Sequence, residues 1–274
     1  MSKGRILVVE DDGNIAKVVR HHFQKIGYEV VLAADGADGL DRVGETPFNA
    51  VICDLLMPRI GGIDFIRVAR SANPHLAIVV ISASPTAENV LSTLDLGAYR
   101  FLAKPFQLVE LARVVELAMT READRTTTVE HKDDWVEITA SSDMENIDRL
   151  ENFLALLAAS ALPPDDVDSL TTGFRQLMAN AIEWGNNFDP SLRVKVAFRV
   201  KADRVEVRVQ DEGTGFNTKS VDTSYESDAQ AALQRLKDGR RAGGFGIRTV
   251  RELMDEVKYS AKGNEVVMAK YIRR

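Results

Sequence analysis

The sequence predicts an α/β protein with two domains. The first is built on a doubly wound parallel sheet of five strands, and the second is an α/β sandwich with a mostly antiparallel sheet. Over residues 6–103, five short apolar runs alternate with stretches of helical spacing, which is typical of parallel strands covered by helices on both faces. Beyond residue 134, strand-like runs alternate polar and apolar residues and are joined by short turns, which indicates antiparallel hairpins.

The five predicted strands of the first half occupy residues 6–9, 30–33, 50–53, 78–81 and 101–103. Apolar residues recur at helical spacing between them, most clearly over residues 15–26, and again after the last strand over residues 108–118. The whole chain has 274 residues, of which 45% are hydrophobic, and this is enough for two domains that each have a core of their own.

Polar side chains follow four of these five strands at the point where each strand ends. They are Glu10, Asp11, Asp54, Ser82 and Lys104. The carboxyl ends of parallel strands meet at one edge of the sheet, where open α/β sheets bind their ligands, so we expect these side chains to converge. Three carboxylates together need a cation, and such oxygen ligands suit Mg²⁺. Asp54 can then accept a phosphoryl group whose oxygens contact Lys104 and Ser82. The alternative, that single acidic residues only cap helices, leaves Lys104 unexplained.

Four short motifs carry these polar residues: Val9-Glu10-Asp11-Asp12, Cys53-Asp54-Leu55-Leu56-Met57-Pro58, Ser82-Ala83 and Lys104-Pro105. Together they resemble the receiver domain of response regulators, over residues 4–122. The resemblance implies a flavodoxin-like fold, Mg²⁺ held at Glu10, Asp11 and Asp54, and phosphorylation of Asp54 by a sensor histidine kinase or a phosphotransfer protein. It also implies a cis peptide bond before Pro105 and a shift of Ser82 and Phe101 on phosphorylation. As a residue of the fifth strand, Phe101 is equally suited to the core.

The helical pattern fades near residue 120, and the polar stretch that follows indicates a domain boundary. We expect a first domain over residues 1–122, a linker over 123–134 that includes His131, and a second domain over 135–274. The net charge of -6 and the lack of a long basic block argue against DNA binding. Because the sequence has no signal peptide and no apolar run of about 18 residues, we expect a cytoplasmic protein without a membrane partner.

The second half begins with a predicted strand over residues 135–140, a helix after residue 143 and another helix that starts at Pro164. Gln176 and Asn180 share one face of this second helix because they are four residues apart. A hairpin over 194–209 ends in Asp211-Glu212-Gly213-Thr214-Gly215, and Gly243-Gly244-Phe245-Gly246 opens a later helix. Such glycines let the backbone approach a base or leave amides free for phosphates, although each pair alone is equally a turn.

The order of these features resembles the Bergerat ATP-binding fold of histidine kinases and anti-sigma-factor serine kinases. The segments 180–186 and 263–266, which read Asn-Ala-Ile-Glu-Trp-Gly-Asn and Gly-Asn-Glu-Val, favour the anti-sigma group. The resemblance implies that Asn180 binds Mg²⁺, that Asp211 accepts a hydrogen bond from adenine, and that four glycines shape the ATP pocket, namely Gly213, Gly215, Gly244 and Gly246. It also implies a lid over residues 217–242, where Arg240 and Arg241 either reach phosphate or are solvated.

Gln176 departs from the glutamate that this family usually has as its catalytic base, and an amide cannot accept the proton. Two functions therefore stay open. Either phosphorylation of Asp54 controls a partner-switching serine/threonine kinase that acts on an anti-sigma-factor antagonist, or a catalytically weak ATP-binding module sequesters a sigma factor or its antagonist by contact. A histidine kinase is disfavoured because the chain lacks a substrate histidine domain. We expect phosphorylation to act on a homodimer or on the packing of the ATP domain.

Overall fold

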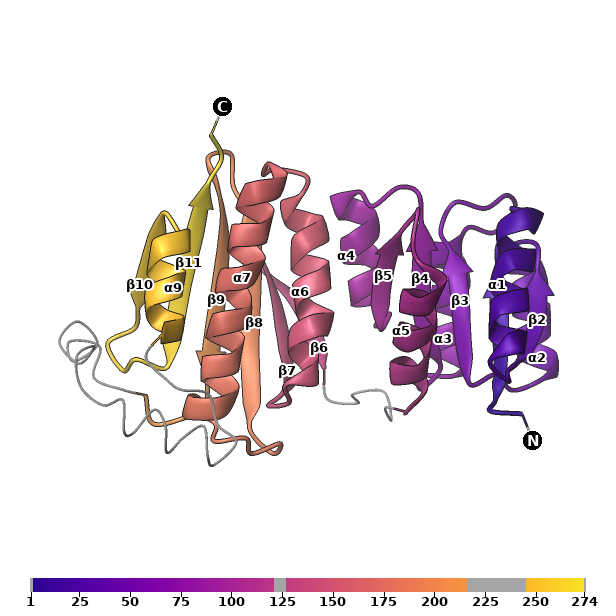
Figure 1. The fold of residues 1–274 in the computed structure, drawn as a ribbon, viewed down its shortest axis with the longest axis horizontal. Helices are drawn as coiled ribbons and strands as arrows, with labels where there is room; N and C mark the ends of the chain where they lie inside the picture. Colours follow the sequence, from indigo (N-terminus) through magenta and orange to yellow (C-terminus); the bar gives the residue numbers. More distant parts are fainter. Residues whose placement is uncertain (1, 121–126, 216–244, 274) are drawn as a thin grey trace. The chain divides into compact units, whose positions relative to one another are not determined.

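The computed structural model describes residues 2–120, 127–215 and 245–273. The chain divides into two compact units, Met1–Arg125 and Thr126–Arg274, and each unit has a sheet of its own (Figure 1). The expected fold classes are confirmed, since the first sheet has five strands and the second is antiparallel. Within the described part of the chain, no helix is long and apolar enough to cross a membrane.

The first unit alternates strands and helices along the chain. Its elements are β1 (Arg5–Val9), α1 (Gly13–Lys25), β2 (Glu29–Ala33), α2 (Gly36–Glu45), β3 (Ala50–Asp54), α3 (Gly62–Ala72), β4 (Ala77–Ser82), α4 (Ala87–Asp95), β5 (Arg100–Ala103) and α5 (Leu108–Thr120). The strand order is β2-β1-β3-β4-β5 and all four pairings are parallel. This is the flavodoxin-like order, in which the strand sequence reverses between β1 and β3.

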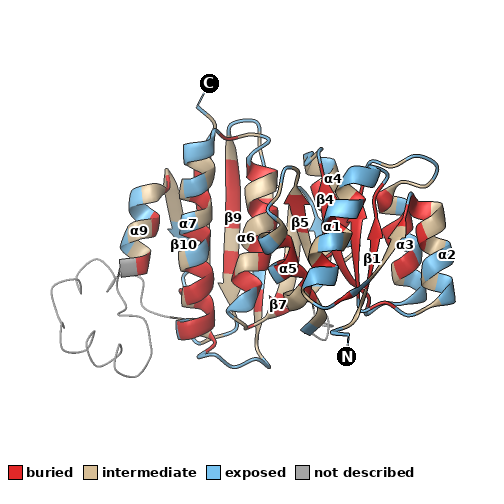
Figure 2. Ribbon diagram, turned by 45° about the vertical axis from the view of Figure 1, so that its right-hand side comes forward, coloured by how far each residue is buried: buried red, intermediate tan, exposed pale blue. Residues whose placement is uncertain are grey.

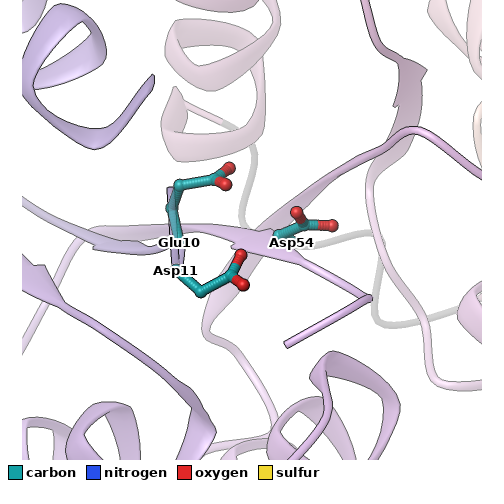
Figure 3. Close-up of side chains that lie close together, drawn as sticks. All are labelled: Glu10, Asp11 and Asp54. Carbon is teal, nitrogen blue, oxygen red and sulfur yellow. The ribbon is translucent and has the colours of Figure 1, made fainter. Parts of the chain in front are cut away.

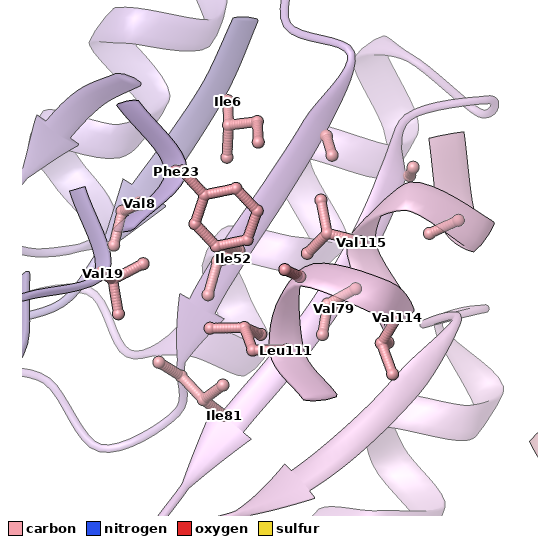
Figure 4. Close-up of a cluster of buried hydrophobic side chains, with 14 of the residues drawn as sticks. Ile6, Val8, Val19, Phe23, Ile52, Val79, Ile81, Leu111, Val114 and Val115 are labelled. Atoms are coloured by element: carbon pink, nitrogen blue, oxygen red, sulfur yellow. The ribbon is translucent and has the colours of Figure 1, made fainter. Parts of the chain in front are cut away.

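Burial on both faces explains why the strands of this sheet are continuous apolar runs. Every residue of β3 and β4 is buried. Helices α1 and α5 cover one face, where Phe23 and Leu111 pack in one cluster with Ile6, Ile52 and Val79 (Figure 4). Figure 2 shows that the buried residues concentrate in the strands and on the inner sides of the helices. Such packing fixes the point at which each strand leaves the core, and hence the position of the residues that follow it.

The second unit is a two-layer α/β sandwich. Its elements are β6 (Thr128–Lys132), β7 (Trp135–Ser141), α6 (Glu145–Ala158), α7 (Pro164–Asn180), a π-helical segment η1 (Ala181–Gly185), β8 (Arg193–Val200), β9 (Arg204–Asp211), α9 (Phe245–Leu253), β10 (Glu256–Tyr259) and β11 (Glu265–Tyr271). The six strands pair antiparallel in the order β10-β11-β9-β8-β7-β6. Helices α6, α7 and α9 cover one face of this sheet (Figure 1). The expected hairpin of β8 and β9 is confirmed.

Strand β6 corrects the expected linker over residues 123–134. Residues 128–132 pair antiparallel with β7, with Glu130 opposite Glu137, so the latter part of the expected linker belongs to the second sheet. β6 lies at the edge of that sheet, and all of its residues except Val129 are exposed. An edge strand needs few apolar residues and is often protected by charged ones, which is why its polar sequence resembled a linker.

Candidate functional site

The first candidate site lies at the carboxyl ends of four neighbouring strands. Glu10 and Asp11 follow β1, Asp54 ends β3, Ser82 ends β4 and Lys104 follows β5. These strands are adjacent in the sheet, and β1 and β3 are the pair at which the strand order reverses. The fold therefore brings the ends of the strands that carry all five predicted residues to one edge of the sheet.

The carboxylates of Glu10, Asp11 and Asp54 form a tight cluster. One oxygen from each lies within 4.8 Å of the others, and the three side chains lie close together (Figure 3). Glu10 and Asp54 are buried, whereas Asp11 is exposed. Burial raises the pKa of the Glu10 carboxyl; the hydrogen bond from Lys104 opposes this rise, and the charge of Asp54 adds to it. This arrangement concentrates negative charge at an edge that solvent reaches from the Asp11 side.

Lys104 supplies the positive charge that balances part of this cluster. Its Nζ donates to Glu10 Oε2 at 2.7 Å, to Glu10 Oε1 at 3.0 Å and to Asp54 Oδ2 at 2.6 Å. Burial alone lowers the pKa of Lys104, but the hydrogen bonds to Asp54 and Glu10 outweigh it, so the pKa lies above its usual value. The ammonium group is thus held charged against the two buried carboxylates.

Backbone contacts fix the residues around this cluster. The Leu56 amide donates to Asp54 Oδ1 at 3.2 Å, and Gly62 packs so closely that a Cβ there would lie 2.1 Å from the Asp54 carbonyl oxygen. The Lys104 amide donates to the Ser82 carbonyl at 2.8 Å. The peptide bond between Lys104 and Pro105 is cis, as expected.

Ser82 and Phe101 are both fully buried. The Ser82 hydroxyl accepts a hydrogen bond from the Ser84 amide at 3.2 Å. Burial of Phe101 agrees with a core residue and with a switch residue alike, so its role stays a prediction.

The donor set of the cluster fits a magnesium ion. Mg²⁺ prefers hard oxygen ligands and retains several waters, and it is usually bound by one or two carboxylates. Two buried carboxylates and one exposed carboxylate provide such ligands with access to solvent. Sulfur and nitrogen ligands, which softer metals prefer, are missing from this group of three.

The second candidate site lies where α7, η1 and the end of β9 meet. Gln176 and the last residue of α7, Asn180, are both partly exposed, and η1 continues directly from Asn180. Asp211 ends β9, and the loop with Gly213 and Gly215 follows it. Segment η1 contacts β9, so the asparagine end of α7 and the aspartate end of β9 belong to one region.

Two other predicted features concern the glycine-rich segment before α9. Gly246 is a buried residue in the first turn of α9. Gly244, Arg240, Arg241 and the expected lid over 217–242 lie outside the described residues. Their roles therefore stay predictions from the resemblance.

Close backbone contacts position the Asp211 carboxylate. The Gly213 amide donates to Asp211 Oδ1 at 2.9 Å. A Cβ on Gly185 would lie 2.3 Å from Asp211 Cγ, and a Cβ on Gly213 would lie 2.2 Å from the Gly185 carbonyl oxygen. Burial raises the pKa of Asp211, although the Gly213 amide and the charge of Lys262 oppose the rise. Gly185 and Gly213 therefore leave room for the Asp211 carboxylate in a confined place, because a side chain at either glycine would displace it.

Gly215 allows a further close approach. It has a φ of +77°, and a Cβ there would lie 1.9 Å from the Lys262 carbonyl oxygen. The turn between β10 and β11 therefore packs directly on the loop after Asp211. A side chain at this position is excluded by both the backbone conformation and the lack of space.

Three residues near Asp211 were not predicted as site residues. They are Gly185, Asn186 and Asn264, which contact Asp211 or its neighbours. All three lie within the segments 180–186 and 263–266. Their position in these segments was the one sign in the sequence that they could belong to the site. Sequence spacing alone gave no reason to place them beside Asp211.

Comparisons with known proteins agree with this division of the chain. Residues 6–116 match the family model of the response regulator receiver domain, and residues 140–270 match that of the histidine kinase-like ATPase domain. The chain is 39% identical over 124 residues to the response regulator MprA of Mycolicibacterium vanbaalenii, covering 45% of this chain and 52% of that protein. It is 29% identical over 129 residues to the uncharacterized transcriptional regulatory protein YkoG of Bacillus subtilis, covering 47% and 57%.

The chain thus spans about half the length of these curated relatives. Among solved structures, the receiver domain of the Francisella response regulator 1452 is 28% identical, with 43% of this chain and 98% of that chain covered and a TM-score of 0.42. A receiver domain joined to an ATPase-like domain fits a two-component response regulator. Residues 6–116 therefore belong to the response regulator receiver domains, and residues 140–270 of the same chain belong to the histidine kinase-like ATPase domains.

Proposed function

We propose that the protein is a response regulator that is phosphorylated on Asp54 and that thereby controls an ATP-binding output domain. The observation that carries this proposal is the contact of Lys104 with both Asp54 and Glu10 beside a third carboxylate. In the reaction, an Asp54 carboxylate oxygen forms a bond to phosphorus while the nitrogen–phosphorus bond of a phosphohistidine donor breaks. The imidazole nitrogen of the donor keeps the electron pair of the broken bond.

The residues around Asp54 have distinct parts in this proposal. Lys104, which is 2.6 Å from Asp54 Oδ2, attracts the new phosphoryl oxygens, and the Ser82 hydroxyl donates to one of them. When bound at the carboxylate cluster, Mg²⁺ would offset the charge of the phosphoryl oxygens. Glu10 and Asp11 are the proposed ligands together with Asp54, and the negative charge of the cluster favours a divalent cation there.

The test of this part is labelling by a small phosphodonor. The native chain should incorporate radiolabel from acetyl phosphate in the presence of Mg²⁺, and Asp54→Asn should abolish the labelling. Asp64→Asn, at an exposed position on α3, is the matched control and should label like the native chain. Labelling that persists in Asp54→Asn would overturn the assignment of Asp54.

We further propose that the second domain binds ATP with Mg²⁺ and acts by partner switching on an anti-sigma-factor antagonist. The support for nucleotide binding is the confined Asp211 carboxylate beside Gly185 and Gly213, which suits a hydrogen bond from the adenine amine. The proposed partner rests on the resemblance of segments 180–186 and 263–266 to the anti-sigma group. Asn180 at the end of α7 is the proposed magnesium ligand. Calorimetry with ATP and Mg²⁺ tests binding, and a lack of binding heat at high protein concentration would remove the nucleotide from the proposal.

Gln176 favours a second candidate function, in which the domain binds ATP and a partner but transfers little phosphate. An amide can orient a hydroxyl group or water, but it cannot take its proton, and the loss of a general base typically lowers the rate on the order of 10² to 10⁴. The two candidates are distinguished by γ-phosphate transfer to a candidate antagonist. Robust transfer that Asn180→Ala abolishes would exclude the binding-only function. A rise in transfer with Gln176→Glu would identify the missing base as the cause of weak activity.

A further inference from the structure

We propose that Asn186 is a positioning residue that fixes the direction of the Asp211 carboxylate, and that Asn264 does the same from the opposite side. The inference rests on the proposed nucleotide site and deepens it, because it makes the preference for one base depend on Asn186 and Asn264. We call this pair of asparagines the clamp. The ligand class that follows is a 6-aminopurine nucleotide, in preference to a 6-oxopurine nucleotide.

Asn186 joins three segments through hydrogen bonds. Its side-chain Oδ1 accepts from the Glu212 amide at 3.0 Å, and its Nδ2 donates to the Arg193 carbonyl at 2.9 Å. Its own amide donates to the Ala181 carbonyl at 2.8 Å, which closes the π-helical segment η1. With an exposed fraction of 1%, Asn186 has both ends of its side-chain amide engaged inside the protein. It therefore ties the end of η1 to the start of β8 and to the peptide that directly follows Asp211.

Asn264 bonds to both peptide groups of Asp211: its side chain to the peptide that Asn186 also engages, and its backbone carbonyl to the preceding one. Its Nδ2 donates to the Asp211 carbonyl at 2.9 Å, and its carbonyl accepts from the Asp211 amide at 3.0 Å. The Glu212 side chain adds a further link, since its Oε2 accepts from the Arg193 amide at 2.8 Å. Asp211 is thus held through its own peptide groups on the β11 side and through the Glu212 amide on the β8 side.

A fixed backbone determines where the carboxylate points. Gly185 borders the carboxylate, and the Gly213 amide donates to its Oδ1. No other described residue donates a hydrogen bond to Oδ2. An ionised carboxylate only accepts hydrogen bonds. It attracts the amine of a 6-aminopurine and repels the carbonyl oxygen of a 6-oxopurine. This preference between the two bases depends on the orientation of the Asp211 carboxylate. If Asp211 is held less firmly, the protein should no longer distinguish the two bases, even if phosphate contacts keep the nucleotide bound.

The test compares the affinities of ATP and inosine triphosphate by calorimetry in the presence of Mg²⁺. Asn186→Asp keeps the size and the Oδ1 acceptor of the side chain but replaces the Nδ2 donor with an oxygen that faces the Arg193 carbonyl. We expect the ratio of the ATP affinity to the inosine triphosphate affinity to fall roughly tenfold. This is the effect of losing one hydrogen bond to a charged group, here the bond from the purine amine to Asp211. Asn187→Asp makes the same chemical change at the next, exposed residue and should leave the ratio unchanged.

The outcomes separate this inference from the proposed function. If neither nucleotide binds the native chain, the proposed nucleotide site fails and the inference fails with it. If ATP is preferred by the native chain and the preference is unchanged in Asn186→Asp, the inference alone is overturned. Should Asn186→Asp fail to fold, as judged by tryptophan fluorescence, Asn264→Ala removes the donor to the Asp211 carbonyl and takes its place. A preference retained in that variant would overturn the clamp in the same way.

Discussion

We predict that Lys104→Met destabilises the receiver domain at neutral pH and that acid reverses much of this loss. Lys104 contacts Glu10 at 2.7 Å and Asp54 at 2.6 Å, and the exposed fractions of the three side chains are only 14%, 1% and 7%. Methionine fills a similar volume without the charge. The variant would therefore leave two buried carboxylates beside the exposed Asp11, without the cation that now bonds to both.

The magnitude follows from these distances. At an effective dielectric constant of about 20, each contact has a Coulomb energy on the order of 6 kcal/mol, most of which offsets the desolvation of the charged groups. Removal of one partner from a buried ion pair typically costs about 3 to 5 kcal/mol. We expect a loss near the lower bound, roughly 3 kcal/mol, because Asp11 is exposed and lets water reach the cluster.

The dependence on pH has a definite sign. The pKa of Glu10 is already raised by burial, and the hydrogen bond from Lys104 that opposes this rise is lost in the variant. A carboxyl with a raised pKa binds its proton more tightly in the folded state, so stability increases as the pH falls through the folded pKa. The gain is complete below the usual value of 4.5. Between neutral pH and about pH 5, the variant should therefore recover stability relative to the native chain.

The assay must report on the receiver domain alone. Both tryptophans, Trp135 and Trp184, lie in the second unit, so amide hydrogen exchange of peptides from β1 and β3 is the better measurement. Lys17→Met, which removes the same charge from the exposed side of α1, should change stability by less than about 0.5 kcal/mol. Equal losses in the two variants, or a loss in Lys104→Met that is the same at both pH values, would refute this reasoning.

Three further variants address other contacts. Lys270→Met removes a buried ammonium that donates to the last carbonyl of α9 at 2.8 Å. In unfolding monitored by tryptophan fluorescence, this variant should lower the stability of the second unit by about 1 to 3 kcal/mol. Lys258→Met, at an exposed position, should not lower it. Arg59→Ala releases the loop after β3 from the buried carboxylate at the start of α2, so amide exchange in residues 55–61 should become faster and the rest of the domain should be unchanged. Gly185→Ala places a methyl group 2.3 Å from Asp211 Cγ and should abolish ATP binding measured by calorimetry while tryptophan-monitored unfolding stays cooperative.

The receiver site could be predicted from the sequence because its residues follow the ends of buried strands. Each apolar run defines a strand, and parallel strands place their carboxyl ends at one edge, so Asp54 and Lys104 converge although they are far apart in the chain. The structure adds what spacing cannot give, namely that Lys104 bonds to both buried carboxylates. Strand β6 escaped prediction for the opposite reason, since an edge strand such as 128–132 is defined by pairing with its neighbour rather than by burial.

The second site was only partly predictable because its geometry depends on contacts between segments that are distant in sequence. Asn186 bonds to the amide of Glu212, which is 26 residues later, and Asn264 bonds to the Asp211 carbonyl across 53 residues. The motif predicted that Asp211 has a role, but only the packed sheet shows which side chains hold it. Conversely, the departure at Gln176 is readable from the sequence alone, because the chemistry of an amide does not depend on its neighbours.

Both sites have a buried carboxyl at the end of a strand, but they differ in how the charge of this carboxyl is balanced. The difference agrees with the ligands we propose. In each site, burial raises the pKa of a carboxyl that lies at the end of a strand, Glu10 in the first and Asp211 in the second. At the first site Lys104 bonds directly to the carboxylates, which suits a group that brings more negative charge together with a cation. Asp211 has no ion pair among the described residues and is balanced by the Gly213 amide and the charge of Lys262. A carboxylate balanced in this way retains its capacity to accept a hydrogen bond, and a neutral donor such as an amine on a purine base satisfies it without adding charge to the interior.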